Sequence, residues 1–159
     1  MEWTRTAIAP ATADWLAALP ERLAARAWRL DHEAPPDPIW EYVTNRTVAR
    51  AGIGALATPF GMHGHTHIPV AFCEEDGVLE TISPGDGSRL ALAGRRALLN
   101  PGSVGQPRDG IPSASWLLLD TDAGAVSWHR TAYDIRPVQR RMEAAGLPER
   151  LVARLAYGL

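Results

Sequence analysis

The interpretation of this chain begins at Gly64-His65-Thr66-His67-Ile68-Pro69. With His63 just before it, this stretch holds three of the five histidines of the protein. In a strand or extended loop alternate side chains point the same way, so we expect His63, His65 and His67 to share one face. Neutral imidazoles that converge in this way bind Zn, Mn, Fe or Ni. A solvated polar loop is the alternative, because two or three histidines alone are an incomplete set of ligands.

Three further stretches accompany this motif along the chain: 31–42 (DHEAPPDPIWEY), 100–108 (NPGSVGQPR), and the ending formed by Tyr133-Asp134, 145–149 (AGLPE) and Arg154-Leu155. Together with Gly64 to Pro69 they resemble, in the same order, segments of the calcineurin-like metallophosphoesterases. The resemblance is to the small bacterial phosphodiesterase branch of that superfamily, whose signature is a glycine-histidine-x-histidine motif.

The resemblance implies an α/β (α+β) fold, part of a four-layer α/β/β/α sandwich of two sheets flanked by helices. Members of the family open with an aspartate-x-histidine strand end, a glycine-aspartate pair and a glycine-asparagine-histidine-aspartate turn, and this sequence has none of these motifs. The similarity is therefore to the C-terminal two-thirds of the family's domain. We expect residues 1–159 to form a single, incomplete metallophosphoesterase domain that lacks the N-terminal metal-binding βαβ part.

Carried over by position, the resemblance makes His32 and His65 ligands of one metal ion and His67 a ligand of a second. In the family, two divalent ions, here Mn, Fe, Ni or Zn, hydrolyse a phosphate mono- or diester, because a metal pair activates water and stabilises the phosphoryl oxygens. His32 follows a predicted strand, which is where layered α/β folds build their sites. An exposed turn histidine is the alternative. Glu33-Ala34 replaces a glycine-serine pair of the family, which alters the local backbone preference, because Glu33 enters positive φ less easily than glycine.

The glycine-rich stretch from Asn100 to Arg108 supplies the second group of candidates. Its backbone N–H groups, the Asn100 amide and the Ser103 hydroxyl could contact an anion or support the histidines, with Gly102 giving the loop its flexibility and Arg108 near the phosphate. A connecting turn that only packs beneath the site is an equal alternative. His129 falls within a predicted hairpin strand, so we interpret it as a sheet-face residue.

Composition sets the broad class. The chain has 159 residues, 46% of them hydrophobic and 21% charged, which is typical of one globular domain. A net charge of −2 gives no broad positive potential that would attract nucleic acid or an anionic membrane. One cysteine, Cys73, precludes an internal disulfide and reads as a buried strand residue. Without a signal-like start or a long apolar run, we expect a soluble cytoplasmic protein.

The first part of the chain predicts two helices and two strands. The first helix covers residues 12–20, with Thr12 or Asp14 as its N-cap and Pro20 at its end. Strands follow at 22–26 and 27–31, the second of which delivers His32 at its end. A helix from Pro38, capped by Asp37, is predicted to run through Ala51.

The remainder reads as short strands separated by glycine-containing turns, which predicts mostly antiparallel hairpins after residue 69. The expected strands cover 69–72, 78–82, 89–93, 96–100, 115–120 and 125–131. Two C-terminal helices follow, one between Asp134 and Gly146 and one opened by Pro148.

Three functional interpretations follow. The first is a metal-dependent phosphoesterase for a phosphorylated small molecule, present here as a portion that is inactive alone. The second is one half of a split enzyme, completed by a separate N-terminal half, or a homodimer. The third is a non-catalytic scaffold, as in the retromer subunit that resembles this family. The three histidines favour a metal site, because a scaffold does not need them.

Overall fold

The structure is a computed structural model, and it describes residues 2–32 and 42–159. Its strands are β1 (Arg22–Ala25), β2 (Trp28–Asp31), β3 (Phe60–Met62), β4 (Val70–Glu75), β5 (Val78–Ile82), β6 (Arg89–Ala91), β7 (Arg96–Asn100), β8 (Ala114–Asp120) and β9 (Ala125–Thr131). Its helices are α1 (Glu2–Ala7), α2 (Pro10–Ala17), α3 (Arg46–Ala55), α4 (Arg136–Ala144) and α5 (Glu149–Ala153), followed by the 3-10 turn η1 (Arg154–Tyr157). The predicted strands and the two C-terminal helices are confirmed.

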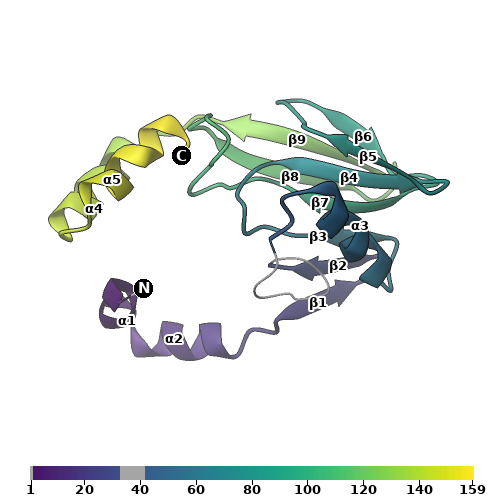
Figure 1. Ribbon diagram of the computed structural model, residues 1–159. Coiled ribbons are helices and arrows are strands. Elements are labelled where there is room, and N and C mark those ends of the chain that lie inside the picture. The colour runs from purple at the N-terminus through teal and green to yellow at the C-terminus, as the bar shows by residue number, and fades with distance from the viewer. Residues whose placement is uncertain (1, 33–41) are drawn as a thin grey trace.

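The strands form two sheets, one of six strands in the order β1-β2-β3-β7-β4-β5 and one of three in the order β6-β9-β8 (Figure 1). Neighbours β2, β3 and β7 run parallel, and the other pairs are antiparallel. The mixed α+β class is therefore confirmed. The hairpin pattern missed one feature: β6 leaves its sequence neighbours and pairs with β9 in the second sheet.

The main core lies between the two sheets. Its buried residues come from both, and they are Trp28, Ala71, Cys73, Leu92, Ala97, Leu99, Val126 and Trp128. The indole N–H of Trp128 donates to the carbonyl of Asn100 at 2.9 Å, so the polar edge of this side chain is satisfied inside the core. Cys73 is buried, as predicted. On the outer face of the second sheet, His129 stacks on Trp116, which confirms its interpretation as a sheet-face residue.

A second core lies on the other face of the six-stranded sheet, beneath α3. Ala49 and Ile53 of this helix pack against Phe72, Leu79 and Leu98 of the sheet. The Arg96 guanidinium donates to the carbonyls of Ile53 and Leu56 at the C-terminal end of α3, both at 2.7 Å. These bonds satisfy carbonyls that a helix end leaves unpaired and fasten α3 to β7.

Two predicted helices differ from the structure, one in its start and the other in its continuity. The N-cap of α2 is Ala9, with Pro10 in the first turn, because the fixed φ of proline opens a helix without a side-chain cap. Helix α3 begins at Arg46, since the side chain of Asn45 accepts from the N–H groups of Thr47 and Val48. The predicted start at Asp37 and Pro38 lies outside the described residues, and residues 42–44 are not helical.

The helices at both ends extend away from the sheets (Figure 1). Helix α2 has no buried residue within the part of the chain that the structure describes, and Trp15 and Leu16 are 62% and 46% exposed. In the same part of the chain, no helix is long and apolar enough to cross a membrane. The exposed apolar groups of α2 are therefore surface features of the isolated chain.

We predict that this chain associates with itself in solution. Exposed apolar side chains on an extended helix favour contacts that remove them from water, at about 25 cal/mol per Å². Light scattering of the purified protein should give a mass above 17.2 kDa. Replacing Trp15 and Leu16 by serine should shift the population toward monomer, whereas Val78→Ser, at an exposed strand position, should not. A monodisperse monomer of the unmodified chain would contradict this expectation.

Candidate functional site

Three loops meet at one edge of the six-stranded sheet because β2, β3 and β7 are parallel neighbours. Parallel strands end at the same edge, so the segments that follow them lie together. His32 follows β2, residues 63–67 follow β3, and Asn100 is the last residue of β7. The register also places the backbone N–H of His63 on the carbonyl of Leu99, at 2.9 Å.

His32 and His65 are in contact, although 33 positions separate them. Nδ1 of His65 lies 2.8 Å from Nε2 of His32, and the rings meet edge to face. The carbonyl of His32 accepts from the backbone N–H groups of Gly64 and His65, both at 3.0 Å, so the main chain fixes the pair. The ring of Tyr42 packs edge-on against His65, with centroids 4.1 Å apart.

His67 has a defined protonation pattern. Its Nδ1 lies 2.7 Å from the carbonyl oxygen of Gln106, which can only accept, so Nδ1 carries the proton and Nε2 keeps its lone pair. Burial is the main cause that lowers the pKa of His67, and Arg108, His32 and Arg154 lower it further against the opposing Gln106 bond. The neutral imidazole with a free Nε2 is the form in which histidine binds metals.

His63, His65 and His67 do not share one face, so that prediction is wrong. The chain turns after Gly64, where the N–H of His67 donates to the Gly64 carbonyl and His67 takes a φ of 60°. His63 points into the interior and is 2% exposed, and burial lowers its pKa from 6.5 to about 4. Its Nε2 has no hydrogen-bond partner among the described residues.

Asn100 joins the two loops that follow β3 and β7. Its side chain is fully buried, and its Nδ2 donates to the Gly64 carbonyl at 2.7 Å and to the Thr66 hydroxyl at 3.0 Å. Its Oδ1 accepts from the N–H of Gly102 at 2.8 Å. One amide thus satisfies groups on both sides of the site and holds the turn between His65 and His67.

The loop from Gly102 to Arg108 is folded tightly against this turn. Gly102 has a φ of +85°, and a Cβ there would lie 2.5 Å from the hydroxyl of Ser115. The hydroxyl of Ser103 accepts from the N–H of Gln106. The backbone N–H of Arg108 donates to the His67 carbonyl, and its guanidinium donates to the Gln106 side chain but leaves Nε buried without a partner in the described residues.

The donor set suits a transition metal but is incomplete. His32, His65 and His67 supply imidazole nitrogens, which bind Zn, Ni or Mn. Across residues 2–32 and 42–159, however, no three His, Cys, Asp or Glu side chains are gathered in a way that would hold a metal ion. Glu33, which the sequence placed beside His32, lies outside the described residues.

Several residues of the site were not among the predicted ones. Gln106 fixes the His67 tautomer through its backbone, and Thr66 accepts from Asn100, neither of which a side-chain motif could indicate. Tyr42 and Arg154 lie in stretches that carried the resemblance, so their positions were a usable signal. His63 belonged to the motif, but its burial was not visible in the alternation of residues.

We predict that Gly102→Ala destabilises the protein by about 2–5 kcal/mol, from a positive φ that costs about 1–2 kcal/mol and a clash with Ser115 that costs about 1–3 kcal/mol. Gly105→Ala is the matched control in the same loop, because nothing lies within 4 Å of its added Cβ, and it should change stability by less than about 0.5 kcal/mol. Urea unfolding measures both. Equal effects would show that Ser115 does not constrain the loop.

Protonation of His63 should destabilise the fold on acidification. The unfolded chain takes up this proton near pH 6.5, whereas the folded chain resists it until about pH 4. Stability is therefore full above pH 6.5 and falls as the pH drops toward 4, by up to about 3 kcal/mol at 1.36 kcal/mol per unit. Urea unfolding from pH 7 to 4 should show this slope, and His63→Asn should reduce it. An unchanged slope would place the titration elsewhere.

Comparisons with known proteins agree with this geometry. No protein-family model matches the chain. The uncharacterized protein MJ0912 of Methanocaldococcus jannaschii is 33% identical over 162 aligned positions, which cover 98% of this chain and 63% of that protein. The crystal structure of a metallophosphoesterase from Sphaerobacter thermophilus is 39% identical and superposes with a TM-score of 0.95, over 99% of this chain and 65% of that chain.

The hypothetical protein PH1004 from Pyrococcus horikoshii OT3 shares the fold, with a TM-score of 0.69 at 18% identity over 92% of this chain and 54% of that chain. The chain thus spans less than two-thirds of the length of each of these relatives. The resemblance seen in the histidine motif and its companion stretches is confirmed by a solved structure. This chain is similar to the metallophosphoesterase from Sphaerobacter thermophilus and has the fold of the matching part of that protein.

Proposed function

We propose that the chain forms part of a metal-dependent phosphoesterase, with His32, His65 and His67 as metal ligands. The contact between His32 and His65, which joins loops 33 positions apart, is the observation that carries the proposal. At this distance one ring nitrogen can donate a proton to the other, and both nitrogens can instead face a shared ion. His67, whose Nε2 keeps its lone pair, lies in the same turn.

A bound divalent ion would supply a Lewis acid and a hydroxide at neutral pH. The residues of this chain would contribute the imidazoles and orient them. Gln106 holds His67 in the ligand tautomer, and Asn100 holds the turn through Gly64 and Thr66. Carboxylates, which balance charge between two cations, must come from residues outside those the structure describes.

Arg108 is our candidate for the phosphate contact. Its guanidinium lies near His67, lowers the pKa of that residue, and has a buried Nε without a partner among the described residues. Guanidinium groups suit phosphate oxygens because their donors form a planar fork. The Ser103 hydroxyl and the loop around Gly102 then act as support, which is the second of the two interpretations that the sequence left open.

A further segment of the same polypeptide or a separate N-terminal half provides the completing ligands. A non-catalytic scaffold of the same fold is the second candidate. It is favoured by one observation only, that no complete group of metal ligands is gathered within the described residues. The substrate class we propose is a phosphorylated small molecule.

The test is hydrolysis of p-nitrophenyl phosphate and its bis ester with added Mn, Ni or Zn. We expect feeble activity from this chain, because losing one electrostatic element of such a site costs about 100- to 1000-fold in rate. Adding a segment with the missing carboxylates should restore turnover. His67→Ala should then abolish it, whereas His129→Ala, on the outer sheet face, should not. Robust turnover by the chain alone that survives His67→Ala would refute the site.

A further inference from the structure

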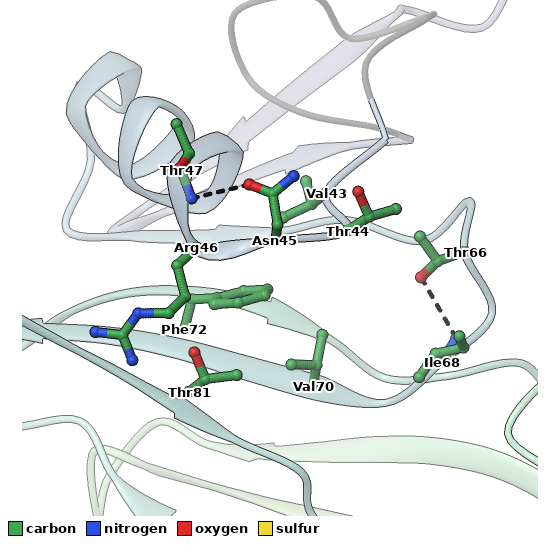
Figure 2. A pocket seen from close by; sticks show the side chains of 10 residues that line it. All are labelled: Val43, Thr44, Asn45, Arg46, Thr47, Thr66, Ile68, Val70, Phe72 and Thr81. Carbon is green, nitrogen blue, oxygen red and sulfur yellow. Dashed lines mark hydrogen bonds between the residues drawn. The ribbon is translucent and has the colours of Figure 1, made fainter.

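A cavity of about 700 Å³ lies between the start of α3 and the six-stranded sheet, beside the histidine turn (Figure 2). Figure 2 shows residues 43–47 on one side and Val70, Phe72 and Thr81 on the other, with Thr66 and Ile68 at one end. The volume lies within the range of about 300–1,000 Å³ that is usual for small-molecule sites. Neither the proposed metal ligands nor the Arg108 contact uses this space.

Two segments of the chain connect the cavity lining to the histidine site. Thr66 lines the cavity and stands between His65 and His67, where Asn100 donates to its hydroxyl. On the other side, Val43 lines the cavity directly after Tyr42, whose ring packs against His65. The cavity therefore borders the two segments that carry Tyr42, His65 and His67.

The side chains that line the cavity favour a ligand group that is apolar and uncharged. Four side chains give an apolar wall, namely Val43, Ile68, Val70 and Phe72, and threonine hydroxyls border it at positions 44, 47, 66 and 81. No acidic side chain is among the described residues of the lining, and Arg46 is its one cation, which already donates to the Leu79 carbonyl. The lining therefore does not repel an anionic ester, and its apolar side chains can pack against the apolar part of the ester.

We propose that this cavity binds the organic group of the phosphoester, and that the group is an apolar ring such as an aryl alcohol rather than a small polar alcohol. The proposal rests on the proposed function, because it assumes that the phosphate lies at His32, His65 and His67. The apolar wall then decides which ester is held. The phosphate site and the cavity would each contribute to affinity, which lets the two be tested separately.

The experiment is backbone amide NMR of the chain, first titrated with Zn and then, with and without Zn, with phenyl phosphate and, for comparison, glycerol phosphate. Phenyl phosphate should perturb the amides of residues 43–47 and 68–72 and bind at least about tenfold more tightly than glycerol phosphate, through burial of the ring. Phenol, which lacks the phosphate, should perturb the same amides more weakly. Equal affinity for the two phosphates, or no response at these amides, would overturn the proposal.

Two variants that fill the cavity provide the matched test. Thr81→Trp places a large ring at the exposed edge of the cavity and should weaken phenyl phosphate binding by at least about tenfold. Thr44→Trp, in the segment before α3, should weaken it by a similar factor. Val78→Trp is the control, because Val78 is on the same strand as Thr81, is 70% exposed and does not line the cavity. Unchanged affinity in both filling variants would overturn the proposal.

The same titrations separate this inference from the proposed function. If the chain binds no Zn at the histidines but phenol still binds in the cavity, the cavity proposal stands and the metal site fails. If Zn shifts the imidazole resonances of His65 and His67 but phenyl phosphate leaves the amide resonances of residues 43–47 unchanged, the metal site stands and the cavity proposal fails.

Discussion

The buried amide of Asn100 is the interaction on which the arrangement of the site depends. A primary amide offers two donors and one acceptor, and here all three are used, by Gly64, Thr66 and Gly102. Leaving such groups unpaired in the interior costs about 1–3 kcal/mol each, so the two loops are held in one geometry. Asn100 is also the last residue of β7, so its hydrogen bonds fix the histidine turn relative to the sheet.

Much of the fold could be predicted from local patterns. The hairpins at β4-β5 and β8-β9 follow from apolar runs separated by glycine turns, and Asp134 and Gly146 marked the two ends of α4. Such signals are carried by neighbouring residues, so a sequence displays them directly. The predicted helix from Pro38 through Ala51 is not continuous, because residues 42–44 are not helical and the side chain of Asn45 caps a new start at α3.

The site was predictable in its residues but not in its geometry. The motif indicated His65 and His67, and a strand end indicated His32, which does contact His65. The alternation of histidines suggested a common face, yet the turn at Gly64 is held by Asn100, which lies 36 positions away. The alternation of neighbouring residues carries no information about contacts between positions so far apart in the sequence. The same reason explains why Gln106, which acts through its backbone oxygen, left no trace in the pattern of side chains.

The parallel pairing of β2, β3 and β7 has a consequence for how this protein acquires its site. Each of these pairings closes a loop of more than thirty residues before any ladder bond forms, whereas the hairpins close within a few residues. Non-local pairings of this kind form late and slow the folding of small domains. The histidines are therefore expected to meet only in the last stage of folding, after the hairpins are in place. An ion that needs both His32 and His65 would therefore bind only after these strands have paired.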